Sequence, residues 1–189
     1  GYDPEYEDFR TGKSAKGAGV YMFDADTGDL LWTTYDASGG DEDNLEYSVV
    51  SQIKAVDREG DGDVDHLYFG DLGGQVFRID LKSDHASSDS KTDFGKVTRL
   101  ANFKETGKYA PRFYEMPAFS IYRNATGIFA VLSIGSGNRS TPLLGKVIDS
   151  QYVTPDESDT ENQKLLNDAI YNIYDLAVTD KNPANSTKG

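Results

Sequence analysis

An acidic loop in the first half of the chain constrains the fold most. Residues 57–65 read Asp-Arg-Glu-Gly-Asp-Gly-Asp-Val-Asp, so an acidic side chain stands at every second position. A hard cation such as Ca²⁺ takes about six to eight oxygen ligands, and a short loop can supply them from alternate positions if glycine at the sixth position allows a sharp turn. Gly62 is that glycine. The loop therefore predicts a calcium site with five ligands: Asp57, Glu59, Asp61, Asp63 through its backbone carbonyl, and Asp65.

The residues after this loop predict a β-hairpin and not the exit helix of an EF-hand. An EF-hand loop carries a bidentate Glu at its twelfth position, whereas this sequence has Tyr68 there. Residues 66–69 are predicted to form a strand, 70–74 a turn and 75–81 the returning strand. A solvated acidic turn is the alternative, but five acidic residues and one Arg within nine positions would repel one another strongly without a cation.

Composition narrows the class of protein. The 189 residues suit one domain, and twelve Tyr with nine Phe suit the faces of β-sheets. The net charge of −13 argues against nucleic acid as a partner and against docking on anionic membranes. Without cysteine, the chain has no disulfide, Cys-ligated zinc or thiol nucleophile.

Targeting signals are not expected within this sequence. No apolar run approaches the roughly 18 residues of a membrane-spanning helix, so no membrane insertion is predicted, and there is no signal peptide. The chain begins with Gly1 and not with Met. We interpret it as a piece of a longer chain, in which any targeting signal would lie upstream.

Repeated hairpins predict the fold class. Residues 19–35 are predicted to form two strands joined by a turn at Gly28, where a hairpin needs a positive φ. Tyr21 and Tyr68 occupy similar places in two hairpins and are 47 residues apart, and residues 127–137 form a third, looser copy. Periods in the forties, with about four short strands per unit, are typical of β-propeller blades. The sequence therefore predicts an all-β fold that is part of a β-propeller.

The remaining segments set the predicted boundaries. Residues 1–16 are a polar, acidic lead-in, residues 17–178 hold the blades, and residues 179–189 form a disordered polar tail. Two prolines in residues 108–117 favour a link between blades. Further strands are predicted at 48–56, at 97–102 and at 168–176, the last with a helix as the alternative.

Four stretches together resemble the C-terminal propeller of PilY-type proteins, the type IV pilus-associated biogenesis factors and adhesins. Residues 19–32 are similar to the quinoprotein-style hairpin of that family, and residues 57–81 to its calcium loop and following strand pair. Residues 133–139 resemble a strand end usually written G-T-G-[RK], with Ser136 and Asn138 departing from it, and residues 170–175 resemble a downstream aromatic segment. Glu59 stands where the family usually has Asp or Asn.

The resemblance implies a fold, a place and a role. The fold is part of a modified seven-bladed propeller with quinoprotein-like blades and one EF-hand-like calcium loop. The place is the cell surface of an exporting bacterium, at the pilus tip (the fimbrium) or associated with the outer membrane. The role is pilus assembly, control of extension and retraction, and surface attachment, with calcium bound in the loop. The implied partners are minor pilins or other pilus tip components, host or abiotic surfaces, and the remainder of the propeller.

The sequence leaves three other functions open. The first is a secreted propeller in which calcium is purely structural. The second is a quinoprotein-dehydrogenase-like enzyme, which is disfavoured because the two histidines, His66 and His85, belong to no catalytic arrangement; we therefore predict no enzymatic activity. The third is an FG-GAP or integrin-like binding module, since such blades use the same kind of loop and the sequence has N-glycosylation sequons at Asn124, Asn138 and Asn185.

Overall fold

The computed structural model describes residues 17–37, 40–82, 94–104, 110–137, 139, 147–148, 151–152 and 168–179. In this part of the chain the fold is all-β, apart from one short 3₁₀ turn, η2 (Glu42–Asn44). The strands are β1 (Tyr21–Phe23), β2 (Leu30–Thr33), β3 (Lys54–Val56), β4 (His66–Gly70), β5 (Gln75–Leu81), β6 (Gly95–Asn102), β7 (Ala118–Asn124), β8 (Gly127–Gly135), β9 (Val147–Ile148), β10 (Gln151–Tyr152) and β11 (Ile170–Asp175).

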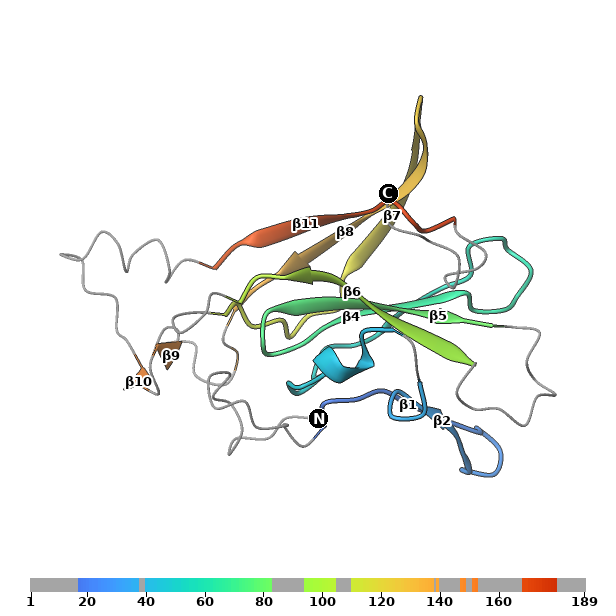
Figure 1. Cartoon of the computed structure of the whole chain (residues 1–189), viewed down its shortest axis with the longest axis horizontal. Coiled ribbons are helices and arrows are strands. Elements are labelled where there is room, and N and C mark those ends of the chain that lie inside the picture. Colours follow the sequence, from blue (N-terminus) through green and yellow to red (C-terminus); the bar gives the residue numbers. More distant parts are fainter. Residues whose placement is uncertain are drawn as a thin grey trace.

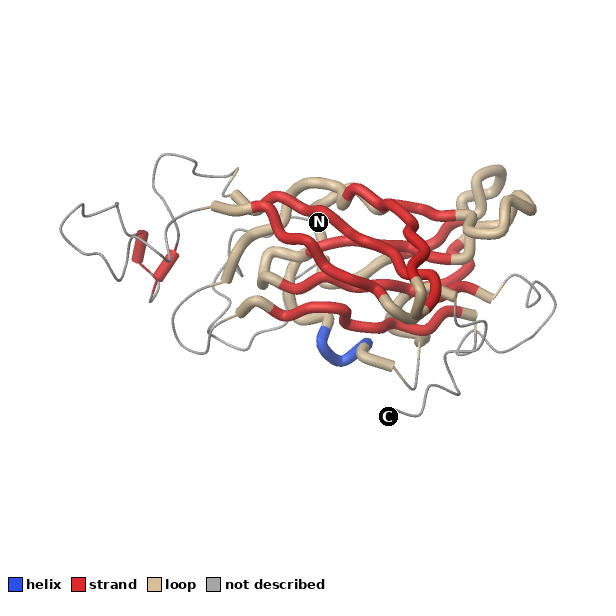
Figure 2. Tube along the Cα trace, turned by 90° about the horizontal axis from the view of Figure 1, so that it is seen from above, coloured by secondary structure: helices blue, strands red, loops and turns tan. Residues whose placement is uncertain are grey.

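The described strands form antiparallel sheets that follow chain order. β1 pairs with β2, β3 to β6 form a four-stranded meander, and β7, β8 and β11 form a three-stranded sheet with β8 in the middle. The short strands β9 and β10 pair with each other. Figure 1 shows the first three of these sheets stacked as layers, with the four-stranded sheet between the other two. Seen from above, their strands run along the long axis of the molecule (Figure 2).

The four-stranded sheet is covered on both faces, which explains the nearly continuous burial of β5. On β5 the alternate residues Phe77 and Ile79 belong to the core shared with the β1–β2 hairpin, whereas Val76 belongs to the core shared with the three-stranded sheet. Successive side chains of a strand point to opposite faces. A strand between two layers therefore loses the usual alternation of apolar and polar residues.

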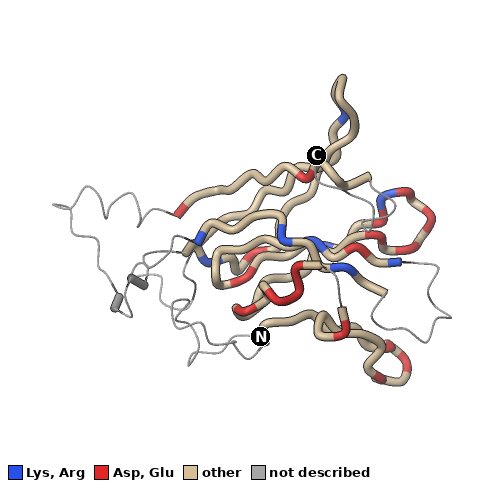
Figure 3. Tube along the Cα trace, in the orientation of Figure 1, with Lys and Arg blue, Asp and Glu red and all other residues tan. Residues whose placement is uncertain are grey.

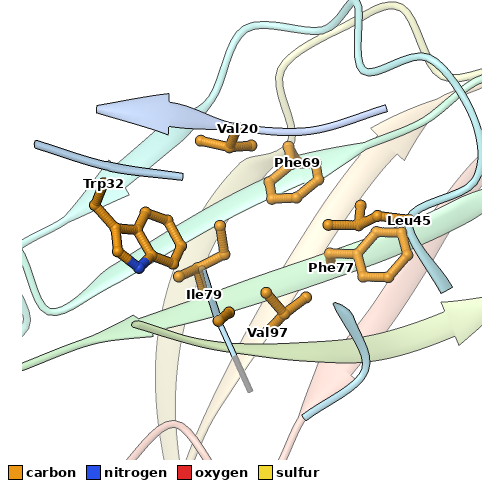
Figure 4. Packing of buried hydrophobic residues seen from close by; sticks show 8 residues of the cluster. Val20, Trp32, Leu45, Phe69, Phe77, Ile79 and Val97 are labelled. Carbon is orange, nitrogen blue, oxygen red and sulfur yellow. The ribbon is translucent and has the colours of Figure 1, made fainter. Parts of the chain in front are cut away.

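The first core lies between the β1–β2 hairpin and the four-stranded sheet. Trp32 is 1% exposed and packs beside Phe94, with the ring centroids 5.9 Å apart. Gly95 lies directly under the indole, since a Cβ atom at that position would stand 2.7 Å from the Trp32 ring. Figure 4 shows Trp32 with other residues of this core. They are Val20, Leu45, Phe69, Phe77, Ile79 and Val97.

The second core joins the four-stranded sheet to the three-stranded sheet. Tyr68 of β4 is fully buried, and its ring lies 5.3 Å from that of Phe119 on β7. Leu132 and Ile134 of β8 and Ile173 of β11 complete the contact from the other side. Both cores are therefore interfaces between successive sheets, which ties the three layers into one body.

Most of the predicted strands are present, with bounds within a few residues of those predicted. The prediction for 48–56 is wrong over most of its length, because only β3 at its end pairs in a sheet. The residues before β3 are held by isolated bonds instead: Leu72 N donates to Ser48 O, and Ser51 Oγ donates to Gly70 O. Strand β7 was not predicted, although it pairs with β8 along its whole length. Within the predicted segment 168–176, the structure has the strand β11 (Ile170–Asp175) and not the alternative helix.

Several predictions concern residues outside the described part of the chain. These are the acidic lead-in at 1–16, nearly all of the polar tail at 179–189, His85, and the sequon positions Asn138 and Asn185.

Candidate functional site

The acidic loop 57–65 connects β3 to β4 and is closed at its base by backbone hydrogen bonds. Asp65 N donates to Val56 O at 2.9 Å, and Leu81 N donates to Asp65 O at the same distance. Asp65 is thus fixed to β3 on one side and to β5 on the other. All five predicted ligands lie in this one loop, where Asp65 is half-buried and the other four are exposed.

Asp57 organises the turn of the loop. Its carboxylate accepts hydrogen bonds from Gly60 N at 2.6 Å and from Gly62 N at 2.9 Å. Both glycines have positive φ, 76° and 102°, a region that L-residues with a Cβ atom rarely adopt. The two N–H bonds, that from Gly62 first, hold the pKa of Asp57 below its ordinary value. The carboxylate is therefore kept ionised at the first ligand position.

Three of the other acidic side chains, those of Asp61, Asp65 and Glu59, have partners within the loop. Asp61 Oδ1 accepts Asp63 N at 3.0 Å, and Asp65 Oδ2 accepts Arg58 N at 2.6 Å. Glu59 Oε1 lies 3.0 Å from Arg58 Nη2. In the part of the chain that the structure describes, no three or more His, Cys, Asp or Glu side chains are gathered closely enough to hold a metal ion. Backbone N–H groups and the guanidinium group of Arg58 are the partners of these carboxylates in this structure.

A buried polar cluster, not anticipated from the sequence, lies next to the loop. Arg78 of β5 is its centre: Nη1 donates to Asp175 of β11 at 2.7 and 2.8 Å, and Nη2 donates to Asp80 at 2.9 Å. Tyr68 donates its hydroxyl hydrogen to Asp175 Oδ2 at 3.0 Å. Burial disfavours the charge of Arg78, but Asp80 and Asp175 outweigh it and raise its pKa. Burial and then Asp175 raise the pKa of Tyr68, which stays neutral.

His66 completes this cluster and connects it to the chain after β11. Its Nδ1 lies 2.7 Å from Asp80 Oδ1, and its Nε2 lies 3.1 Å from Val178 O. A carbonyl oxygen can only accept, so Nε2 carries a hydrogen. Because Nδ1 faces the Asp80 carboxylate, the His66 ring joins the buried cluster to the backbone of Val178.

The pattern that would have signalled this cluster is the alternation along β5. After Gln75, Arg78 and Asp80 are the polar residues of β5; they lie on the same face of the strand, and both are buried. A charged pair on one face of a buried strand needs partners on the opposing layer. Those partners come from β11, whose position beside β4 and β5 does not follow from local sequence.

Acidic residues are unevenly distributed over the molecule. Figure 3 shows them concentrated in the loop 57–65, at the tip of the β1–β2 hairpin and around η2. The sheet formed by β7, β8 and β11 carries few charges.

Among the described residues, no helix has the length and apolar character needed to cross a membrane. No family model, curated protein or solved structure matches the chain.

Proposed function

We propose that this chain is a calcium-binding β-propeller region of a type IV pilus-associated tip adhesin or biogenesis factor of the PilY type. The observation that carries the calcium part is the loop 57–65. Asp57 already accepts the N–H groups of Gly60 and Gly62, so the backbone is wound into the sharp turn that alternate ligand positions require. The ligands are Asp57, Glu59, Asp61, the carbonyl of Asp63, and Asp65.

The layered sheets support the propeller part of the proposal. The β1–β2 hairpin, the four-stranded meander and the three-stranded sheet follow one another in sequence and in space. The outer face of the three-stranded sheet carries exposed aromatic side chains: Tyr122 and Phe129 stack with their ring centroids 5.7 Å apart, and Tyr174 is 64% exposed. A further blade of the same propeller is the partner that would cover this face.

The pilus part of the proposal rests on the resemblance of residues 19–32, 57–81, 133–139 and 170–175 to the PilY type. We propose an exported protein at the cell surface whose partners are minor pilins or other tip components. Its contribution is to assembly, to the control of extension and retraction, and to attachment. No catalytic role is proposed: His66 is 4% exposed and is bonded within the buried cluster, where no substrate could reach it.

A calorimetric titration tests the calcium proposal. Protein stripped with a chelator is titrated with Ca²⁺, and one saturable site is expected that excess Mg²⁺ does not occupy. Asp61→Ala removes one ligand and is expected to abolish the heat while the circular dichroism of the β-fold is kept. Absence of binding in the unmodified chain, or undiminished heat in the variant, would contradict the site.

A purely structural calcium site is the second candidate function. The bonds from Asp65 to Val56 and Leu81 favour it, because a cation held at Asp65 would pin the loop to β3 and β5. Purified minor pilins separate the two candidates. Pilin binding to the immobilised chain that weakens when calcium is chelated supports the pilus role. Pilin binding that is the same with and without the chelator supports a purely structural calcium site.

A further inference from the structure

We propose that the chain forms a symmetric dimer in which the β7 strands of two copies pair antiparallel, edge to edge, with Tyr122 of one copy facing Tyr122 of the other. The three-stranded sheets of the two copies then join into one continuous sheet. This dimer needs neither the calcium site nor the pilus role proposed above. Because the contact is made at the edge of the sheet, the outer face stays open to a further blade.

β7 is an edge strand whose far side is open. In the described part of the chain it is hydrogen-bonded to β8 alone, and no backbone bond from another described segment reaches its other side. Such an edge presents a row of N–H and C=O groups that a second extended strand can pair with. The edge strand β6 differs, because Asp41 N donates to Val97 O at 2.8 Å and Asp41 Oδ2 accepts Arg99 N at 2.9 Å. Among the described residues, the chain thus covers the edge at β6 and leaves the edge at β7 open.

The β7 edge lacks the features that usually keep edge strands from pairing. Proteins protect exposed edges with short strands, prolines, β-bulges or several charges. β7 has seven residues and no proline, and its register with β8 runs without a shift from Ala118 to Asn124. Arg123 is the one charged residue of the strand. The edge is therefore long, regular and nearly uncharged, as a strand that pairs with another chain must be.

The hairpin of β7 and β8 projects from the body of the molecule. Figure 1 shows its tip extending beyond the three layers, where a second copy can approach it. Ile121 is 44% exposed and Tyr122 is 52% exposed, although successive side chains of a strand point to opposite faces. The projecting part thus exposes apolar side chains on both faces. A two-stranded hairpin is marginally stable in water, and pairing with a second copy makes it four-stranded there.

The distribution of charge favours β7 as the place where two copies meet. Each chain has a net charge of −13, so two copies repel one another over most of their surfaces. The acidic residues are concentrated in the loop 57–65, at the tip of the β1–β2 hairpin and around η2, as Figure 3 shows. β7 has no acidic residue. A second copy is therefore repelled least when it approaches along this strand.

A row of aromatic rings fixes the register of the pairing. Tyr122 on β7, Phe129 on β8 and Tyr174 on β11 follow one another across the outer face, with ring centroids 5.7 and 6.1 Å apart. Where identical strands pair antiparallel about a two-fold axis, one residue meets itself at the axis. With Tyr122 at the axis, the rows of the two copies join, and directly opposite aromatic pairs stabilise antiparallel strands. Arg123 then faces Ile121 of the second copy, so no like charges are opposite.

Sedimentation equilibrium of the whole chain over a range of concentrations tests the dimer. We expect the mass to rise from that of one chain to that of two and no further, because each dimer uses both β7 edges. Tyr122→Lys places two like charges opposite each other at the axis and is expected to raise the dimer dissociation constant by about tenfold or more. Tyr174→Lys, the same change in the same aromatic row but on β11, is the matched control and keeps the dimer.

A disulfide cross-link tests the register. The chain has no cysteine, so one introduced cysteine can form a disulfide only with that of a second copy. Opposite Cβ atoms in an antiparallel pair are about 4.5–5.5 Å apart, near the roughly 3.5–4.5 Å of a disulfide. We expect Tyr122→Cys to cross-link under mild oxidation. Tyr174→Cys, also on the outer face and exposed, is the control and is not expected to cross-link.

The outcomes that overturn the proposal are specific. A monomer at every concentration contradicts the dimer, and growth to larger oligomers contradicts a closed pair of edges. A dimer that Tyr122→Lys does not weaken, or that Tyr174→Lys weakens as much, is formed by another surface. Equal cross-linking of Tyr122→Cys and Tyr174→Cys overturns the register. Should Tyr122→Lys fail to fold by circular dichroism, Ser120→Lys, which adds a charge to the exposed edge and leaves the aromatic row intact, is expected to weaken the dimer in its place.

Discussion

Arg78 on β5 and Asp175 on β11 are 97 residues apart in the chain and form a buried ion pair in which one guanidinium nitrogen lies 2.7 and 2.8 Å from the two carboxylate oxygens. Their side chains are 4% and 2% exposed. The pair crosses the apolar core between two sheets, where a charge without a partner is costly. It therefore fixes which strand of the three-stranded sheet lies over β5.

Removal of one partner tests this role. Asp175→Ala leaves Arg78 with Asp80 as its remaining carboxylate, and we expect the free energy of unfolding to fall by about 3–5 kcal/mol. Denaturant unfolding measures the change. The control is Glu115→Ala, which breaks a pair with Arg139 whose side chains are 63% and 67% exposed. That control is expected to lose less than about 1 kcal/mol, and an equally small loss for Asp175→Ala would contradict the proposed role.

Local signals were enough for the hairpins of this fold. Gly28 has a φ of 77° in the turn before β2, as its position predicted, and β4 and β5 lie within the predicted hairpin after the loop 57–65. Apolar–polar alternation and turn-forming residues are patterns within a few neighbouring positions, so the sequence alone predicts the hairpins that they produce. The all-β prediction is confirmed for the described residues, whereas the propeller and the calcium site remain proposals.

These local patterns do not predict contacts between segments that are far apart in the chain. The sequence does not predict β7, because its seven residues, Ala-Phe-Ser-Ile-Tyr-Arg-Asn, mix apolar and polar side chains without clean alternation. Six of these seven residues are exposed. The polar cluster was missed because Arg78 acquires its partner from β11. The β-branched residues Val49, Val50 and Ile53 favour a strand over residues 48–53, but in that segment of the chain only Lys54–Val56 pair with a neighbouring strand.

Trp32 is expected to be the largest single contributor to the first core. Trp32→Ala removes a side chain that is 1% exposed and leaves a cavity against Phe94 and Gly95. We expect a loss of about 3–5 kcal/mol in the free energy of unfolding. Leu31→Ala, next to it on β2 but 47% exposed, is the matched control and should lose less than about 1 kcal/mol. Equal losses for the two variants would contradict the assigned packing.

Asp71 is expected to make stability depend on pH. It is fully buried, and burial raises its pKa from 3.8 to about 7 against the opposing N–H bonds of Gln75 and Gly73 and the charge of Arg99. Between these two values the folded chain keeps a proton that the unfolded chain releases. This contribution to the free energy of unfolding is therefore fully present below the lower value and is lost as the pH rises through about 7.

Asp71→Asn tests that dependence, because the amide does not titrate. The variant is expected to begin less stable, since the carboxylate accepts both Gln75 N and Gln75 Nε2, but its urea midpoint should change less from about pH 5 to 8. All other titrating groups are common to the two proteins, so the difference between the two curves isolates Asp71. Parallel curves would contradict the raised pKa.

The turn at Gly62 links the stability of the loop to its proposed ligand. Gly62 has a φ of 102°, and a Cβ atom there would meet no other atom within 4 Å, so the effect of Gly62→Ala is purely one of backbone strain. We expect a loss of about 1–2 kcal/mol in chelator. The calcium dissociation constant should also rise, because relaxing the strain moves Gly62 N away from Asp57.

Gly135→Ala is the control for Gly62→Ala: its Cβ also has open space, but its φ is not in the left-handed region. If Gly62→Ala and Gly135→Ala behave alike in both unfolding and titration, the turn does not depend on a left-handed residue, and the loop geometry on which the calcium proposal rests is wrong.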